Sequence, residues 1–231
     1  MIDLIRSITI FVVGLVVKHS APVPTYPAPM ISAHTLEMVK KFTVLISLEG
    51  FAGGYRGTGV VIDKTHVLTC AHMIHEGEFW VYTYPLGHVI TAHPTWGDGL
   101  HDLAILELDH PIELEHYAVV NTTTSIGQPI VVIGNTLGAM HWFVSYGMIS
   151  DKESFYDITT ALIRGGNSGG PWVNLHGDLV ALTDWGLQSS KGVQENIGGG
   201  IDGATIQKFL KTWKAPSLFD LLLGNSAIKQ R

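Results

Sequence analysis

The stretch Gly-Asn-Ser-Gly-Gly-Pro at residues 166–171 is the most informative part of this sequence. It places Ser168 in a loop rich in glycine, a residue that adopts backbone angles in which other residues are strained. Such a loop can direct successive backbone N–H groups at one point beside the serine hydroxyl, as stabilisation of a developing oxyanion requires. By itself the cluster is more typical of an ordinary turn, so its meaning depends on the rest of the chain.

Two further segments provide a base and an acid for this serine. Residues 67–72 read Val-Leu-Thr-Cys-Ala-His, an apolar strand that leads into His72. Residues 101–108 read His-Asp-Leu-Ala-Ile-Leu-Glu-Leu, so that Asp102 precedes a mostly apolar strand. A serine hydroxyl needs a base within hydrogen-bond reach, and the base needs an acid that fixes its tautomer. Together the segments predict a catalytic triad of His72, Asp102 and Ser168.

The three motifs resemble those of the trypsin-like (chymotrypsin-fold) serine proteases. They are Thr-Cys-Ala-His, Asp-Leu-Ala-Ile-Leu and Gly-Asn-Ser-Gly-Gly-Pro, and the match continues through residues 172–180. The pattern is most similar to the cysteine-poor HtrA/Deg branch, and it covers residues 40–213. The resemblance implies an all-β fold of two six-stranded antiparallel barrels with a C-terminal helix, and an active site in the cleft between the barrels.

The resemblance also implies a role for each site residue. Ser168 is the nucleophile, His72 the general base and then the general acid, and Asp102 orients His72. Residues Gly166, Asn167 and Ser168 form the oxyanion hole, through the backbone N–H groups of Gly166 and Ser168. An asparagine at 167 cannot pair with a new N-terminal amine as an aspartate does in relatives activated by cleavage. We therefore expect activity without trimming.

Substrate selection is expected to depend on two segments. By the family's motif, Leu162, followed by Ile163, lies at the base of the pocket for the residue before the scissile bond. An apolar base favours an uncharged side chain, because an unpaired buried charge is costly. Trp185 and Gly186 resemble a segment that pairs with the substrate backbone as an added strand. Asp184 replaces the usual serine; it either biases nearby subsites toward basic groups or points to solvent.

The other histidines and acids receive structural interpretations. His75 follows His72 closely enough to share a metal, but no further ligand set has fitting spacing, so we expect neither a metal nor a cofactor. His101 is placed on a strand, where it faces away from its neighbour Asp102. Asp98, in a Gly-Asp-Gly sequence, is expected in a turn.

Composition restricts the class of protein. The 231 residues are 46% hydrophobic and 15% charged, which suits a globular core. The net charge is −6, the acids and bases are scattered along the sequence, and no basic patch indicates binding to nucleic acid. Cys70 is the single cysteine, so an intrachain disulfide is excluded. We expect Cys70 to be a small buried core residue.

The sequence divides into an apolar leader (1–19), a Pro-rich linker (20–37), the protease domain (38–213) and a C-terminal tail (214–231). Barrel 1 is expected at about 38–118, barrel 2 at about 125–202 and the helix at 203–213. The apolar run 8–17 would form a helix of about 15 Å, half of a hydrocarbon core of about 30 Å. A signal peptide, an uncleaved membrane anchor through residues 4–17 and a buried element of the domain stay open. We expect an exported or membrane-anchored protein.

Short apolar runs separated by turns predict the strands. They span 42–48, 59–62, 67–69, 79–84, 103–108, 130–133, 142–149, 157–160, 171–174, 179–185 and 197–201. Apolar residues at helical spacing predict the closing helix over 204–214.

The sequence indicates a serine endopeptidase that acts on polypeptides. A non-catalytic peptide-binding scaffold on the same fold and a self-processing protease of a virus or mobile element stay open. An esterase is disfavoured because the chain order Ser-Asp-His of the α/β-hydrolases is absent. A homo-oligomer also stays open, since HtrA relatives often trimerise and residues 34–41 do not decide the matter.

Overall fold

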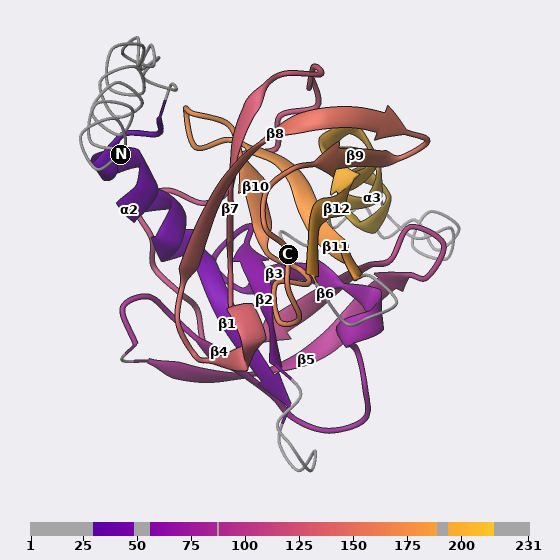
Figure 1. Cartoon of the computed structure of the whole chain (residues 1–231). Helices are drawn as coiled ribbons and strands as arrows, with labels where there is room; N and C mark the ends of the chain where they lie inside the picture. The colour runs from indigo at the N-terminus through magenta and orange to yellow at the C-terminus, as the bar shows by residue number, and fades with distance from the viewer. Residues whose placement is uncertain (1–29, 49–55, 87, 189–193, 215–231) are drawn as a thin grey trace, which may run out of the picture.

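The computed structural model describes residues 30–48, 56–86, 88–188 and 194–214. Their strands form two closed antiparallel barrels, ordered β1-β2-β3-β6-β5-β4 and β10-β11-β12-β9-β8-β7 (Figure 1). The predicted pair of six-stranded barrels is thereby confirmed.

The first barrel contains β1 (Thr43–Leu48), β2 (Arg56–Val61), β3 (His66–Cys70), β4 (Phe79–Tyr82), β5 (Val89–Asp98) and β6 (Leu103–Leu108). The second contains β7 (Pro129–Gly134), β8 (Phe143–Glu153), β9 (Tyr156–Thr159), β10 (Pro171–Val173), β11 (Leu179–Gln188) and β12 (Gln194–Asp202). Two short 3-10 helices, η1 (Ala71–Met73) and η2 (Thr136–Gly138), lie between strands.

Strand β5 is absent from the sequence-based prediction. Most of its side chains are exposed or half-buried, so residues 89–98 lack the apolar run that predicts a strand. Pro94 has no N–H to donate, and it is accommodated beside a register shift between Pro94 and Trp96. Pairing with β4 and β6 closes the barrel through backbone hydrogen bonds, which do not depend on an apolar side chain.

Two helices flank the barrels. Helix α2 (Ala33–Phe42) is capped by Ser32, whose hydroxyl accepts from the N–H of Thr35 at 3.0 Å. Residues 33–37 are therefore helical and do not belong to the predicted linker. Helix α3 (Gly203–Lys214) follows β12, and Asp202 Oδ1 accepts from the N–H of Thr205 at 2.7 Å. This helix confirms the predicted closing helix.

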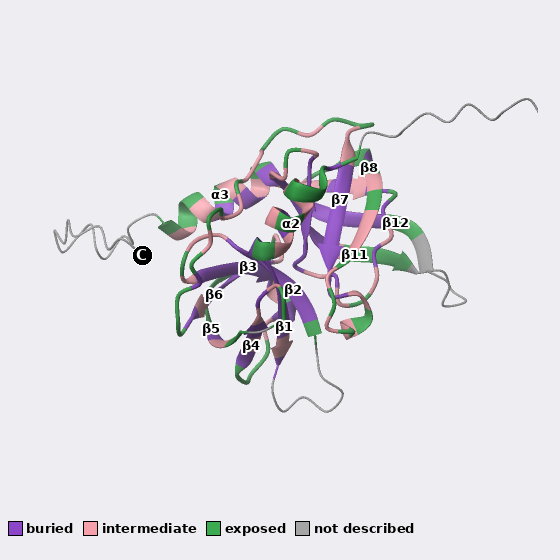
Figure 2. Ribbon diagram, turned by 90° about the vertical axis from the view of Figure 1, so that its left-hand side faces the viewer, coloured by how far each residue is buried: buried purple, intermediate pink, exposed green. Residues whose placement is uncertain are grey.

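The buried residues lie within both barrels and between them (Figure 2). Strand β3 is buried along its whole length. Its antiparallel register pairs Cys70 with Leu103, so the segment after β3 and the segment before β6 meet at one edge of the barrel. Those segments carry His72 and Asp102.

The predicted leader, most of the linker and most of the tail lie outside the described residues, so their assignments stay predictions. Within the described ranges, every helix is too short or too polar to cross a membrane.

Candidate active site

His72 and Asp102 form a two-point contact. The backbone N–H of His72 donates to Asp102 Oδ1 at 2.7 Å, and the ring Nδ1 lies 2.6 Å from Oδ2. Because a carboxylate accepts hydrogen bonds, Nδ1 carries the proton and Nε2 keeps its lone pair. Asp102 has a φ of +53°, and its carbonyl accepts from the N–H of Ala71 at 3.0 Å. This arrangement presents a ring nitrogen that can take a proton.

The same contact separates the pKa values of its two groups. The hydrogen bond to Asp102 is the main reason that the pKa of His72 rises above its usual value. Burial alone would raise the pKa of Asp102, but the hydrogen bond from His72 and its charge bring that pKa below the usual range. Asp102 therefore stays ionised while His72 exchanges its proton.

The loop around Ser168 is fixed by glycines at two positions. Gly166 has a φ of +92° and Gly169 a φ of +78°, both in the region that favours glycine. A Cβ at Gly166 would overlap the carbonyl oxygen of Asn135, and one at Gly169 would overlap that of Thr58. The Ser168 hydroxyl, half-buried, lies 3.4 Å from the carbonyl oxygen of Asp184, to which it donates.

The backbone amides of this loop fall into two groups. Asn167 N–H donates to Arg164 O at 3.0 Å, Gly169 N–H to Thr183 O at 2.8 Å, and Gly170 N–H to Asn167 O at 2.8 Å. The amides of Gly166 and Ser168 donate to no acceptor within the described residues. The N–H of Asn167 serves the turn, and the two remaining amides are those that the sequence analysis assigned as oxyanion donors, Gly166 and Ser168.

Thr58, which the sequence analysis missed, joins the loop around Ser168 (residues 164–170, called the catalytic loop below) to the first barrel. This buried residue of β2 donates from its N–H to Ser168 O at 2.9 Å and from its hydroxyl to Gly166 O at 2.8 Å. The same hydroxyl accepts from Asn135 N–H at 2.9 Å, and the carbonyl of Thr58 accepts from Thr69 Oγ1 at 2.9 Å. Its place between Gly57 and Gly59, in an otherwise apolar run, is the one signal that the sequence offered.

Asp184 does not point to solvent, which was one of the two alternatives considered from the sequence. Its side chain is 13% exposed and is directed at the triad, with Oδ1 3.8 Å from His72 Nδ1. Its Oδ2 accepts from the hydroxyl of Tyr156 at 2.6 Å. Tyr156, on β9, is a further residue of the site that the sequence analysis did not identify.

The other predicted substrate residues are distributed over two environments. Ile163 is 2% exposed and packs in the core of the second barrel, whereas Leu162 is half-buried. Trp185 is 36% exposed on β11 and pairs with Gly199, and the neighbouring Gly186 pairs with Gly198. Trp185 and Gly186 therefore lie at an accessible position, while Ile163 lies in the core.

His101 does not lie on a strand, contrary to the prediction. It occupies the turn before β6, where its Nδ1 is 2.6 Å from Asp98 Oδ2. Asp98 ends β5 and accepts from the N–H of Leu100 at 2.9 Å, which holds the turn that precedes Asp102.

Comparison with known proteins gives the family. A family model described as a trypsin-like peptidase domain matches residues 57–182, more than half of the chain.

The chain belongs to the trypsin-like peptidase family.

Two curated relatives of this trypsin-like domain are named pro-apoptotic serine protease NMA111. The protein from Pyricularia oryzae is 30% identical over 174 residues, which cover 66% of this chain and 16% of the relative. The protein from Ajellomyces capsulatus is 31% identical over 177 residues, covering 67% and 16%. The chain thus spans about one sixth of the length of these relatives.

A solved structure is also similar to this trypsin-like domain. The serine endoprotease from Yersinia pestis has a TM-score of 0.68 and 27% identity, covering 80% of this chain and 67% of that one. These matches confirm the resemblance to the trypsin-like serine proteases and their HtrA branch.

One group of polar side chains in the trypsin-like site has metal-like spacing. The ligand atoms of Cys70, His72, Asp102 and Asp184 lie within 4.8 Å of one another, and His75 is not among them. Hydrogen bonds already use these atoms: Nδ1 of His72 donates to Asp102, and Cys70 Sγ donates to Thr183 O at 3.1 Å. Burial raises the pKa of the Cys70 thiol well above its usual value, which opposes the thiolate that a metal needs. We assign protons, and no metal, to this cluster.

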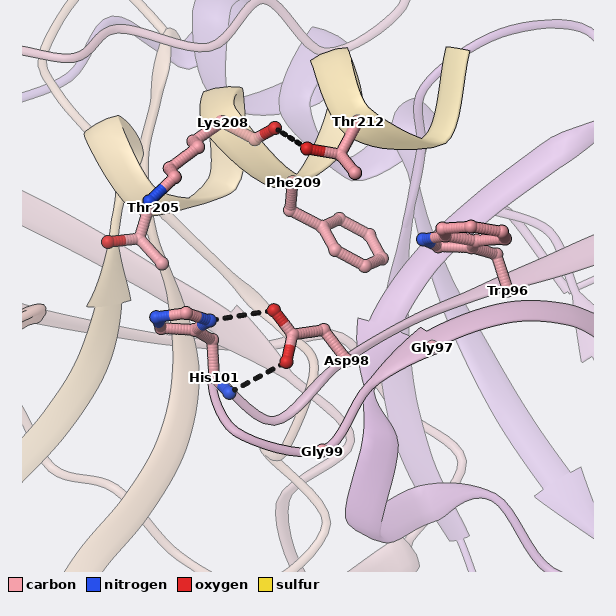
Figure 3. Close-up of a pocket in the computed structure, with 9 residues that line it drawn as sticks. All are labelled: Trp96, Gly97, Asp98, Gly99, His101, Thr205, Lys208, Phe209 and Thr212. Atoms are coloured by element: carbon pink, nitrogen blue, oxygen red, sulfur yellow. Dashed lines mark hydrogen bonds and ion pairs between the residues drawn. The ribbon is translucent and has the colours of Figure 1, made fainter. Parts of the chain in front are cut away.

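A cavity of about 330 Å³ lies between the β5–β6 turn and helix α3 of the trypsin-like domain. Figure 3 shows the Phe209 ring directed into it from α3, with Trp96 and the Asp98–His101 pair around it. None of the triad residues lines this cavity. It adjoins the turn that carries Asp102 and stands apart from the catalytic loop.

Proposed function

We propose that this domain cleaves peptide bonds within extended polypeptides by a His72-Asp102-Ser168 triad and an acyl-enzyme. The observation that carries the proposal is a pair of amides, at Gly166 and Ser168 beside the Ser168 hydroxyl, that donate to no acceptor in the described part of the chain. Two donors without acceptors in a preformed loop are what a developing oxyanion needs. The contact between Asp102 and His72 supports the same assignment, because it leaves Nε2 able to take the serine proton.

The proposed reaction has two balanced steps. His72 Nε2 takes the proton of Ser168 Oγ while Oγ bonds to the substrate carbonyl carbon, and the carbonyl oxygen becomes an oxyanion near the two amides. The C–N bond then breaks, the amine leaves with the proton from His72, and an ester on Ser168 remains. In the second step His72 takes a proton from water while the water oxygen bonds to the acyl carbon; the ester C–O bond then breaks, His72 returns the proton to Ser168 Oγ, and the carboxylic acid leaves.

The substrate would lie against Trp185 and Gly186, with its backbone paired to β11. Apolar Leu162, supported by buried Ile163, favours an uncharged side chain before the scissile bond.

Labelling with a fluorophosphonate probe tests the proposal. We expect covalent label on Ser168 in the wild type, and none in Ser168→Ala or His72→Ala. The matched controls are Ser125→Ala and His110→Ala, which alter an exposed serine and an exposed histidine. Absence of label in folded wild-type protein, with a positive reference protease, would contradict the proposal and favour the peptide-binding scaffold.

A further inference from the structure

Two carboxyl groups meet behind the catalytic histidine. Asp102 Oδ2 lies 2.6 Å and Asp184 Oδ1 lies 3.8 Å from the same nitrogen, His72 Nδ1. The side chains are 21% and 13% exposed, so water screens their charges poorly. Within the described residues, the ion pairs that these carboxyl groups form are with His72. Two negative charges this close in such surroundings are unfavourable unless a proton separates them.

The hydrogen bonds decide which group keeps the negative charge. Asp102 accepts two N–H bonds from His72, one from the backbone and one from the ring. Asp184 Oδ2 accepts from Tyr156 OH at 2.6 Å, and its Oδ1 faces the Asp102–His72 contact. More donors to Asp102 stabilise its carboxylate, which leaves Asp184 as the group that carries a proton.

We propose that Asp184 is a protonated positioning residue, which donates its carboxyl proton from Oδ1 to the Asp102 carboxylate and so limits how strongly Asp102 holds the His72 imidazolium. The inference rests on the proposed triad and deepens it. Tyr156 selects the arrangement, because its hydroxyl occupies Oδ2 and leaves Oδ1 for the proton.

The titratable groups that face Asp184 are Cys70, His72, Asp102 and Tyr156, from four segments of the chain. The net directions of their pKa shifts agree with a protonated Asp184. Burial is the main cause of the raised pKa of Asp184; the hydrogen bond from Tyr156 opposes the rise, and the nearby charge of Asp102 adds to it. Burial and the hydrogen bond to Asp184 raise the pKa of Tyr156, which therefore stays a donor. Cys70 is a neutral thiol because burial raises its pKa, and His72 is, among the described residues that face Asp184, the group that becomes positive when protonated.

The pKa of His72 is the test, measured by NMR titration of its ring in the Ser168→Ala background. Asp184→Asn keeps both contacts, because the amide oxygen can accept from Tyr156 and the NH₂ can donate to Asp102. We expect it to leave the His72 pKa within about 0.3 units of the reference, on the scale at which one unit is a factor of ten. Asp184→Ala removes the donor, so the freed Asp102 carboxylate should hold the imidazolium more strongly and raise the His72 pKa.

An ionised Asp184 gives the opposite result. Removing a negative charge beside His72 would lower the His72 pKa in both variants, and that outcome would overturn the proposal. Asp151→Asn, which neutralises an exposed carboxylate on β8, controls for net charge.

Activity separates this proposal from the function on which it rests. For this measurement Ser168 is kept. We expect Asp184→Asn to label with fluorophosphonate at a rate near that of the wild type, and Asp184→Ala to label several-fold more slowly at neutral pH. Wild-type protein that does not label would contradict the triad, whereas labelling wild type with Asp184→Asn as slow as Asp184→Ala would contradict the role of Asp184 alone.

Discussion

The hydroxyl of Thr58 in the first barrel donates to the carbonyl oxygen of Gly166 in the second barrel, at 2.8 Å. The catalytic loop is therefore held in place by the barrel that carries His72 and Asp102. The backbone of the same residue donates to Ser168 O at 2.9 Å, so one buried threonine contacts both residues of the proposed oxyanion hole.

Thr58→Val tests this contact. Valine keeps the shape of threonine but leaves the Gly166 carbonyl and the Asn135 amide without their partner, which costs about 1–3 kcal/mol for each buried group. We expect a lower free energy of unfolding by denaturant and a slower fluorophosphonate reaction. Thr43→Val is the control, since its buried hydroxyl donates to Val39 O far from the loop. Equal loss of labelling in both variants would show that stability alone was affected.

Gly166→Ala is expected to impair the oxyanion hole. An alanine would be strained at a φ of +92°, and its Cβ would meet the carbonyl oxygen of Asn135, so the loop must move. Loss of one oxyanion donor costs about 10²–10³ in rate, and we expect kcat on a peptide substrate to fall within that range. The neighbouring Gly165→Ala places its Cβ in open space and should retain activity. Near-normal kcat in Gly166→Ala would argue against this amide as a donor.

The pH dependence follows from the raised pKa of His72. Activity requires neutral His72, so kcat/KM should rise with pH through an apparent pKa above 6.5, the usual value of a histidine. Asp102→Asn removes the main cause of the shift, and the acid limb of its residual activity should move to lower pH. An acid limb of the wild-type profile with an apparent pKa below 6.5 would contradict the contact between His72 and Asp102.

The raised pKa of His72 also affects stability, but here the contribution of His72 falls as the pH rises, whereas activity rises. The raised folded-state pKa of His72 means that its pairing with Asp102 stabilises the fold fully below the unfolded pKa of about 6.5, and that this stabilisation is lost as pH rises through the folded value. The lowered pKa of Asp102 adds stability that is lost as pH falls through its folded value. Denaturant unfolding of Ser168→Ala and of Ser168→Ala/His72→Gln should therefore give free energies of unfolding whose difference shrinks as the pH rises above the folded-state pKa of His72.

Trp185 gives a prediction about substrate selection. A Cβ at Gly199 would overlap the indole ring of Trp185, the exposed end of a side chain that can move. Gly199→Ala should displace the indole and raise KM for peptides with little change in the free energy of unfolding. The control for Gly199→Ala is Gly99→Ala, where the added Cβ lies in open space.

The pocket assigned to Leu162 gives a separate prediction. A peptide library should show uncharged residues before the scissile bond in the wild type; a profile dominated by Arg or Lys would contradict that pocket.

An uncleaved preparation should be active. Asn167 Oδ1 accepts from Thr136 Oγ1 at 2.8 Å, so the loop is held by a neutral contact that needs no new N-terminal amine. We expect equal rates of fluorophosphonate labelling before and after limited N-terminal trimming, with intact mass measured for each sample. Labelling that begins only after trimming would contradict this.

The sequence by itself determined most of the strands and the residues of the proposed triad, because both depend on local features, whereas the two six-stranded barrels were implied by the resemblance that the motifs carry. Apolar runs between turns place most strands, and the segments around His72, Asp102 and Ser168 have the short-range composition that their turns require. The antiparallel register of β3 and β6 then brings His72 and Asp102 together at one barrel edge.

Tertiary structure alone decided strand β5, the contact of Thr58 and the direction of Asp184. Strand β5 depends on backbone hydrogen bonds to its neighbours, which leave no apolar pattern in the sequence. Thr58 and Gly166 are 108 residues apart in the chain, and Tyr156 and Asp184 are 28 apart. Only the closure of the barrels brings such groups within hydrogen-bond distance, where burial makes each unsatisfied polar group costly and thereby selects one arrangement.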